Sequence, residues 1–529
     1  MLHARLPVDR FTAASRLYRE FAGAADAPIH RWLGRFDADA DEWSGTGARG
    51  ARVDSAVVEA LVKASAALGV DPGVRDRLRG LADGRVRAVV TGQQPGVLGG
   101  PLMTAYKIAA AAALAREVEA RRGQPCVPVF WMGSEDDDFA EVRALSVLGS
   151  DLSRLDVSVD AAAYRPGLRV GDLGGDAVRA VWGAVAGLVP AGEGARRLGE
   201  IASASADLAG AAAAVIVAAT KGQVAVVDGR EPALRTAARS LLLEYFDRED
   251  ELRAAVDAEG HELAAAGYHA QLSSGSDSGL FLVRDGVRLR VPPERRAVAR
   301  AEFAADINRV SPGVVARNLV QDAVLAPIAV VLGPAEIAYR AQLAPVYRAM
   351  HVASPVVMPR LSATYLPAPV AAMVRELGLA AEYGALQPAE LVRTARAAAE
   401  DVAFKEAALA MEAAFAREAG VFSALAGDRL DARAKEKLER RLRDLAQRLS
   451  QALADAIAQD ARGAESRWPF LSRLLDVFEK DATAQERFLS LAVPLLFHGD
   501  AAWEAISTMA GEWVGDALDR RVWHGVYSV

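Results

Sequence analysis

The chain has 529 residues, of which 52% are hydrophobic, 25% charged and 6% aromatic. This apolar fraction excludes wholesale disorder, and the length predicts roughly two to four domains. A net charge of −7 argues against nucleic acid as the main partner, because phosphate-binding proteins usually carry a basic excess. The single cysteine, Cys126, excludes an internal disulfide framework and cysteine-rich zinc sites.

The N-terminal stretch MLHARLPVDR carries early charges and lacks the apolar core of a signal peptide. The longest apolar runs, near 209–219 and 323–335, are shorter than the roughly 18 residues that a membrane helix needs. With one cysteine, which suits a reducing compartment, the chain is expected to be a cytoplasmic protein without membrane spans.

The first eighty or so residues are expected to be helical, and the pattern changes at 85–92. There RVRAVV predicts a short strand, and the loop TGQQPGVLGGP follows it. The helix LMTAYKIAAAAALAREVEARRG comes next, with Pro101 suited to its first turn and Gly123 to its C-terminal cap. PCVPVFWM, 125–132, is the continuous apolar run of a buried parallel strand, so the stretch predicts one βαβ unit.

Four further regions have the character of strands. They are 223–227, a hairpin of 280–283 with 287–291, 327–332 and 355–358. The last two flank the helical sequence AEIAYRAQLAPVYRAM and predict a second βαβ unit. We therefore expect an α/β fold with an open parallel sheet up to about residue 385, and helical insertions around 160–220 and 230–265.

Beyond Gln387 apolar residues recur at coiled-coil spacing. One series is Phe404, Ala408, Met411, Phe415 and Phe422, and the other is Leu438, Leu442, Leu445, Leu449, Ala452 and Ala456. They predict an antiparallel α-helical coiled-coil hairpin with a turn at 426–431. The expected domains are a core over 1–385, the hairpin over 386–465, and a helical tail over 466–529 that packs on the core or the coiled coil.

The glycine loop is the first candidate site. Gly92, Gly96, Gly99 and Gly100 lie between a strand and a helix N-terminus, where backbone N–H groups and the helix dipole favour an anion. Gln93 and Gln94 add amide groups, and Lys107 lies about two turns into the helix. A tight turn that packs helix on strand is the alternative. Four glycines and two glutamines exceed what packing needs, so a ligand loop is favoured. The sequence is neither a Walker A motif nor G-x-G-x-x-G.

The second candidate is the acidic run after the next strand, Glu135, Asp136, Asp137 and Asp138. Adjacent carboxylates repel one another, so Mg²⁺, a substrate amine or a helix N-terminus should compensate them. A capping box from Ser134 to Asp137 is the structural alternative. Because the run lies at the carboxyl edge of a parallel sheet, where ligands bind, function is favoured.

Two later stretches complete the candidates. His269 lies in GYHAQL before the loop SSGSDSG, although a lone histidine is more often structural than catalytic. In 317–343, a polar helix face with salt bridges is as good an interpretation as a ligand site. The candidate residues from this stretch and the following strand are Arg317, Gln321, Asp322, Gly333, Glu336, Tyr339, Gln342 and Arg360.

Several of these motifs together resemble one known family. VVTGQQPGVLGGPLMTAYK, PVFWMGSEDDDFAEV, GYHAQL, LVQDAVLAPIAVVLGPAEIAYRAQLAPVY and MPRLSAT, spread over about 85–365, resemble the BshC family of bacillithiol biosynthesis. The resemblance implies a Rossmann-like core related to class I synthetase-type nucleotide-binding domains, and a coiled coil used for homodimerisation. Family members usually carry Glu-Asp-His-Asp, so Asp137 stands here at the position of the histidine.

The resemblance also implies an activity, the ligation of cysteine to glucosaminyl-malate to form bacillithiol. ATP would activate the cysteine carboxyl group while the glycine loop holds phosphate or carboxylate oxygens. Glu135 and Asp136 would bind Mg²⁺ or the substrate ammonium, and His269 or a carboxylate would accept the amine proton. Asp138 and the residues from 317–360 would bind substrate.

Two other functions stay open. One is a non-catalytic coiled-coil dimer with a vestigial nucleotide site, and the other is a tRNA-charging or tRNA-modifying enzyme. The second is weakened by the negative charge and by the absence of recognisable class I synthetase signature motifs.

Overall fold

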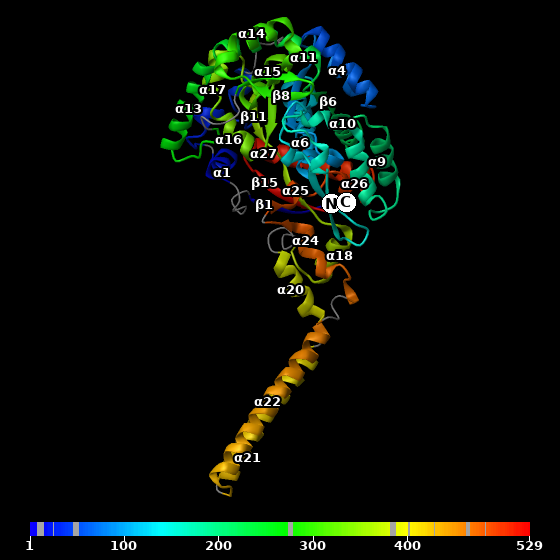
Figure 1. Cartoon of the computed structure of the whole chain (residues 1–529), viewed down its shortest axis with the longest axis vertical. Helices are drawn as coiled ribbons and strands as arrows, with labels where there is room; N and C mark the ends of the chain where they lie inside the picture. Colours follow the sequence, from blue (N-terminus) through cyan, green and yellow to red (C-terminus); the bar gives the residue numbers. More distant parts are fainter. Residues whose placement is uncertain are drawn as a thin grey trace. The chain divides into compact units, whose positions relative to one another are not determined.

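The structure is a computed structural model that describes all residues except 8–14, 25, 46–51, 273–278, 381–387, 400–401, 428, 462–465 and 482. The chain forms two compact units. Residues 1–150, 154–366 and 479–529 make up the first unit, and residues 151–153 and 367–478 the second (Figure 1). The expected boundaries near 385 and 465 therefore fall inside the second unit.

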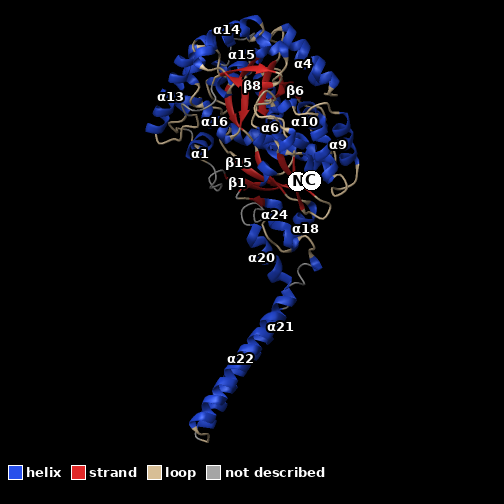
Figure 2. Ribbon diagram, in the orientation of Figure 1, coloured by secondary structure: helices blue, strands red, loops and turns tan. Residues whose placement is uncertain are grey.

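A parallel five-stranded sheet forms the centre of the first unit (Figure 2). Neighbouring strands follow the order β11-β10-β2-β3-β6, and every pair is parallel. The strands are β2 (Arg87–Gln93), β3 (Cys126–Met132), β6 (Ala225–Asp228), β10 (Ala329–Leu332) and β11 (Val356–Pro359). Each lies within one or two residues of a run expected from sequence, and the α/β prediction is confirmed.

Helix α6 (Leu102–Arg122) connects β2 to β3 and packs on both, as well as on β10 and on helix α27 (Ala501–Leu518). Its residues 102–115 are all buried. The alanine run 109–113 explains how a helix can be enclosed on all sides, because methyl side chains let neighbours approach closely. The helix ends at Gly123. Its φ of +63° is the left-handed conformation that a C-terminal cap often adopts and that glycine favours.

A second, three-stranded sheet was not expected from the sequence. It joins β1 (Leu2–Pro7), β15 (Trp523–Tyr527) and β12 (Ser362–Tyr365), with β15 in the middle. The prediction of an entirely helical start and end was therefore wrong at both ends. The helical character between them is confirmed by α1 (Arg16–Gly23), α2 (His30–Leu33), α3 (Glu42–Gly45), α4 (Ser55–Ala67), α5 (Pro72–Arg79), α25 (Gln485–Phe488), α26 (Ala492–His498) and α27.

The expected insertions between the central strands are present. The first contains the hairpin β4 (Ala144–Leu148) and β5 (Arg154–Ser158) and helices α8 (Gly175–Val185), α9 (Glu193–Ala204) and α10 (Leu208–Ala219). The second contains α11 (Pro232–Ala237), α12 (Arg239–Asp247), α13 (Glu249–Ala265), the predicted hairpin β7 (Leu280–Arg284) and β8 (Val287–Arg290), then α14 (Arg296–Ala305) and β9 (Val310–Pro312). Strand β9 pairs with β7 and extends the hairpin to a small sheet.

The second βαβ unit differs from expectation in its helix. The stretch 335–350 forms two short helices, α16 (Pro334–Arg340) and α17 (Ala344–Ala349), rather than one. Pro345 lies in the first turn of α17, where its missing N–H costs nothing. Helix α15 (Val314–Leu325) precedes β10 and begins beside β9.

The second unit is helical. It contains α18 (Ala368–Glu376), α20 (Pro388–Ala399), α21 (Val402–Gly427), α22 (Ala432–Ala461) and α24 (Leu474–Phe478). Helices α21 and α22 pack along one another (Figure 1). Within this pair Ala408 is buried, but the seam residues Met411 and Phe422 remain 56% and 57% exposed. The pair alone therefore does not bury the predicted seam, and the coiled coil stays a prediction.

No helix in the described part of the chain has both the length and the apolar character needed to cross a membrane.

Candidate active site

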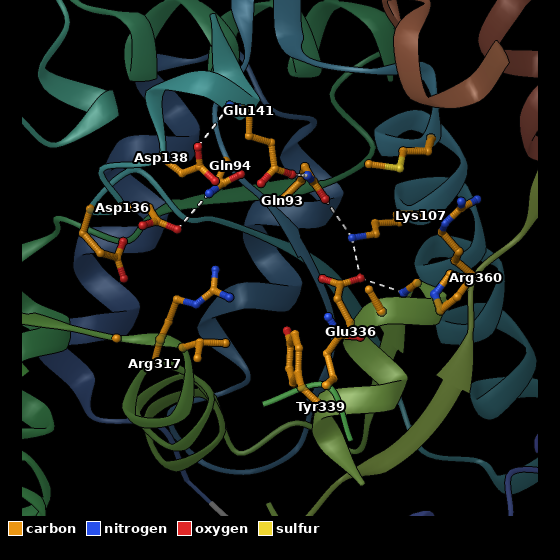
Figure 3. Close-up of a pocket in the computed structure, with 18 of the residues that line it drawn as sticks. Gln93, Gln94, Lys107, Asp136, Asp138, Glu141, Arg317, Glu336, Tyr339 and Arg360 are labelled. Carbon is orange, nitrogen blue, oxygen red and sulfur yellow. Dashed lines mark hydrogen bonds and ion pairs between the residues drawn. The ribbon is translucent and has the colours of Figure 1, made fainter. Parts of the chain in front are cut away.

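The main candidate site is a cavity of about 390 Å³ at the carboxyl ends of the parallel strands (Figure 3). Segments that follow four of these strands supply its walls. Gln93 ends β2, the acidic run follows β3, Gly333 follows β10, and Arg360 follows β11. In a parallel sheet these ends meet at one edge, so residues far apart in sequence converge there.

Most of the residues predicted from sequence line this cavity. They are Gln93, Gln94, Lys107, Glu135, Asp136, Asp138, Arg317, Gly333, Glu336, Tyr339 and Arg360. The lining also includes residues that sequence reasoning missed, among them Glu141, Gln271, Arg288 and Arg487.

Arg288 holds the acidic loop, residues 133–138. Its guanidinium, on strand β8, donates to the carboxylates of Asp136 (2.9 Å) and Asp137. Gln94 donates to the other Asp136 oxygen at 2.8 Å. Burial alone would raise the pKa of Asp136, but Arg288 and Arg317 outweigh it and hold the pKa below its usual value. The mutual repulsion of the acids is thus relieved by an arginine from the β7–β8 hairpin.

Glu135 belongs to the same acidic loop but is almost fully buried, with 1% of its surface exposed. Its carboxylate is 3.6 Å from the guanidinium of Arg235. Within the described residues both of its carboxylate oxygens are shut off from solvent and accept no hydrogen bond. A buried charge is tolerated only beside a counter-charge, and Arg235 supplies one. Asp138 has another role, because it caps helix α7 (Phe139–Val142) in place of the predicted Ser134 capping box.

Two buried ion pairs form the opposite wall. Lys107 Nζ contacts the Glu336 carboxylate at 2.6 Å and donates to the carbonyl of Gly92 and to Gln93 Oε1. Burial lowers the pKa of Lys107, and Glu336 offsets part of that effect. Arg360 donates to Glu486 of helix α25, whose second oxygen accepts from Ser362.

Arg317 differs from these cations, because within the described residues its guanidinium makes no hydrogen bond or ion pair. It lies in the first turns of α15, and its guanidinium is close to Gly133. Burial disfavours its charge, but nearby acidic groups, which include the carboxylates of Asp136, Glu135 and Glu336, favour it, and its pKa is raised. Burial and Glu336 raise the pKa of Tyr339 to about 12, so its phenol keeps its proton and can donate. Figure 3 shows both side chains below the acidic loop.

The glycine loop departs from its predicted role. Gly96, Gly99 and Gly100 do not line the cavity. A Cβ on Gly96 would lie 2.7 Å from the Cα of Gly100, and one on Gly99 would lie 2.6 Å from Val215. Gly99 also has a φ of +86°, a backbone conformation that residues other than glycine rarely adopt. These contacts are those of a tightly packed loop, and a ligand-binding role for these glycines stays a prediction. Gly92 lies against Trp131 of β3 and borders only a small neighbouring cavity.

Four other predicted residues lie away from the cavity lining. Asp322 forms a buried ion pair with Arg340 at 2.6 Å. Gln342 donates to and accepts from the backbone of Leu272, so it holds a loop. Gln321 borders the same small cavity as Gly92. His269 is exposed and does not line the main cavity, and most of the Ser/Gly loop after it lies outside the described residues.

The described residues of the cavity do not form a magnesium site of their own. No three acidic, histidine or cysteine side chains converge as a metal-binding group in the part of the chain that the structure describes. Both Asp136 oxygens already accept hydrogen bonds, and the Glu135 carboxylate is enclosed beside Arg235.

These features define a class, a Rossmann-like α/β domain with a polar ligand cavity at the carboxyl edge of its sheet. The family model described as "Bacillithiol biosynthesis BshC, N-terminal Rossmann-like domain" matches residues 35–361, which is more than half of the chain. The chain belongs to this family.

Curated relatives agree with this assignment. Proteins named "Putative cysteine ligase BshC" from Solibacter usitatus, Koribacter versatilis and Salinibacter ruber are 33%, 30% and 30% identical to the chain. The aligned regions cover 52%, 54% and 58% of this chain and 54%, 56% and 62% of those relatives. The chain thus spans somewhat more than half the length of the relatives it matches.

Proposed function

We propose that the chain is a cysteine ligase that joins the carboxyl group of cysteine to the amine of glucosaminyl-malate and so forms bacillithiol. The family assignment and the names of the relatives support this activity. The observation that carries the proposal is the polarity of the cavity. The guanidinium of Arg317, which has no partner among the described residues, lies there opposite the carboxylates of Asp138 and Glu141. Amide formation brings an anionic carboxyl or phosphate group to an ammonium, and such a cavity attracts both.

ATP is the expected source of energy, because a carboxylate is a poor electrophile until it is activated. Arg317 and the first N–H groups of α15 are suited to an anionic group, either a phosphate or the malate carboxylates. The cavity volume of about 390 Å³ is within the range of small-molecule sites. Magnesium would then arrive with the nucleotide phosphates. A single buried cysteine and a thiol product both suit the cytoplasm.

A reconstituted reaction tests the proposal. The purified chain is incubated with cysteine, glucosaminyl-malate and ATP with Mg²⁺, and mass spectrometry follows bacillithiol, AMP and ADP. We expect bacillithiol with stoichiometric release of one of the two nucleotides. Binding of ATP without amide formation would support the non-catalytic alternative, and tight binding of tRNA in a parallel assay would support the tRNA enzyme.

Homodimerisation through the helical pair is part of the proposal. Large apolar side chains on α21, including Leu409, Met411, Val421 and Leu425, are more than half exposed. A second copy that packs against this pair would cover them. Analytical ultracentrifugation should show a dimer, and Met411→Glu with Phe422→Glu should convert it to a monomer. A wild-type monomer at micromolar concentration would contradict the dimer.

A further inference from the structure

Glu141 is a carboxylate of the cavity wall that lies outside the acidic run. It is the third residue of helix α7, and its backbone N–H donates to the capping carboxylate of Asp138 at 3.2 Å. The cap sets the direction in which α7 leaves the acidic loop. Figure 3 shows the Glu141 side chain reaching from there toward Gln93 and Gln94. Glu141 thus adds a carboxylate to the cavity wall that the acidic run forms, and helix α7 positions it independently of that run.

A chain of three side chains fixes the position of its carboxylate. Lys107 Nζ can only donate, so the Gln93 oxygen that lies 2.9 Å from it is an acceptor. The Gln93 amide nitrogen must then face the other way, where it donates to Glu141 Oε1 at 3.1 Å. Lys107 is itself anchored by Glu336 at 2.6 Å. The buried lysine therefore orients the glutamine, and the glutamine orients the glutamate.

The other Glu141 oxygen, Oε2, accepts no hydrogen bond within the described residues. This distinguishes Glu141 from Asp136, whose two oxygens are both occupied, and from Glu135, whose carboxylate is enclosed. Of these three acids, Glu141 combines a fixed position, a free oxygen and a place in the cavity lining. A group with these properties can accept a proton from a ligand without first breaking an internal contact.

We infer that Glu141 is the catalytic base of the ligation and that Lys107 and Gln93 are its positioning residues. This inference rests on the proposed function. The Glu141 carboxylate takes one proton from the substrate ammonium and becomes a carboxylic acid. The freed lone pair forms the C–N bond at the carbonyl carbon of cysteine activated by a nucleoside triphosphate. The bond from that carbon to the phosphate oxygen breaks, the phosphate group leaves with the electron pair, and the remaining protons pass to water.

The electrostatic surroundings agree with this role. The pKa of Glu141 is raised above its usual value, chiefly by desolvation and then by the carboxylates of Asp138 and Asp136. Lys107 lowers this pKa, and Glu336 raises it. The other charged groups that line the cavity are Glu135, Arg288, Arg317, Arg360 and Arg487. A base whose pKa lies above that of an ordinary glutamate accepts a proton more readily near neutral pH. The same carboxylates attract the ammonium that delivers it.

Kinetics of Glu141→Gln test the inference. The amide is nearly isosteric but cannot accept the proton, so kcat should fall roughly 100- to 10,000-fold while KM for glucosaminyl-malate changes little. In the wild type, kcat should decline on the acid side as Glu141 becomes protonated, and this decline should disappear in Glu141→Gln. Glu294→Gln, an exposed glutamate away from the cavity, is the matched control and should behave as wild type.

The outcomes separate the two proposals. A wild-type enzyme that forms no bacillithiol overturns the ligase and this inference together. An active wild type with an active Glu141→Gln, or with an unchanged acid limb in that variant, overturns the inference alone.

Lys107→Met tests the positioning residues. Loss of the cation should move the acid limb of kcat to higher pH, because Lys107 lowers the pKa of Glu141. A purely structural role would reduce folded protein without moving the limb. If Lys107→Met does not fold, Gln93→Leu removes the hydrogen bond to Glu141 and should lower kcat at least tenfold. An unmoved limb in folded Lys107→Met, or unchanged kcat in Gln93→Leu, contradicts the positioning role.

Discussion

The glycine loop (residues 92–100) and the acidic loop (residues 133–138) follow adjacent parallel strands and end at the same edge of the sheet. Both have the composition of a ligand loop, yet they are used differently. Gly96, Gly99 and Gly100 are enclosed by packing, while Asp136 and Asp138 face the cavity. Only the glutamines of the glycine loop reach the cavity wall.

The difference teaches that two loops at the same edge of a sheet can present very different amounts of side chain to the cavity. A glycine marks close approach of the backbone, and the approaching group can be a ligand or another part of the chain. In the glycine loop it is the chain itself. The N–H of Leu102 donates to the carbonyl of Leu489, and the N–H of Leu491 donates to the carbonyl of Gly100. In the acidic loop, charged partners fix the side chains and leave part of their surface to the cavity.

The largest expected effect is on stability in the glycine loop. Gly96→Ala would place a methyl group 2.7 Å from the Cα of Gly100, which cannot move aside as a side chain would. The free energy of unfolding should fall by at least about 3 kcal/mol in urea denaturation. Gly183→Ala in helix α8 meets no atom within 4 Å and should stabilise by up to about 1 kcal/mol. Equal stability of the two variants would show that packing does not require a glycine at position 96, and would favour a ligand-binding role for the loop.

The dependence of stability on pH should distinguish the contribution of the acidic loop from that of the rest of the fold. Burial lowers the pKa of His524 to about 4 from 6.5, while its ring nitrogens contact Ser362 and Thr364. Above pH 6.5 the His524 imidazole is neutral in both the folded and the unfolded state. As pH falls from 6.5 to 4 only the unfolded state gains the proton, so stability should decline by about 3 kcal/mol.

Asp136 cannot cause that decline, because its pKa lies below the usual value and its contribution is lost only at lower pH. Urea unfolding at pH 7 and pH 4.5 measures the difference, and His524→Gln should reduce it. A decline of the same size in His524→Gln would show that another group is responsible.

Ligand affinity should change next in size. Arg317→Gln removes the guanidinium cation beside Gly133, at the start of the acidic loop. A charge-assisted hydrogen bond contributes about 1.5–3 kcal/mol, so KM or Kd for the anionic substrate should rise roughly 10- to 100-fold. Calorimetry measures the affinity, and an unchanged melting temperature checks the fold. Arg317→Lys, which keeps the charge, should lose less. Unchanged affinity in Arg317→Gln would place the anion elsewhere.

The smallest expected effect concerns the anchor of the acidic loop. Arg288→Gln should lower the free energy of unfolding by about 1–2 kcal/mol, because the carboxylates of Asp136 and Asp137 are each about one-third exposed and water screens part of the interaction. Arg295→Gln, an exposed arginine after the same hairpin, is the control and should change stability little. A loss above 3 kcal/mol would show that the loop contributes more to the core than its exposure indicates.

Much of the fold follows from local patterns in the sequence. The central strands are continuous apolar runs bounded by loop residues, which is the pattern that burial on both faces of a sheet imposes. The sheet of β1, β12 and β15 could not be found this way, because the pairing of β1 with β15 joins residues more than 500 positions apart. Short strands with mixed composition carry no local sign of such a partner.

The residues of the candidate site that follow the central strands could be predicted from the sequence, because strand ends define that edge of the sheet. Arg288 was missed because it reaches the acidic loop from a hairpin insertion 152 residues after Asp136. Asp322 was included because spacing places it on the same helix as Arg317 without showing which face meets the cavity. Glu141 had a usable signal, since a polar residue one turn after an acidic run at a strand end is expected near the same edge.

The ion pair between Arg360 and Glu486 has a consequence for biosynthesis of the chain. The two residues are 126 positions apart, and β12, which follows Arg360, is completed only by β15 at 523–527. The ribosome therefore has to synthesise the chain beyond residue 486 before this wall of the cavity can form. Nascent chains should therefore lack a complete cavity until Glu486 and strand β15 have been synthesised.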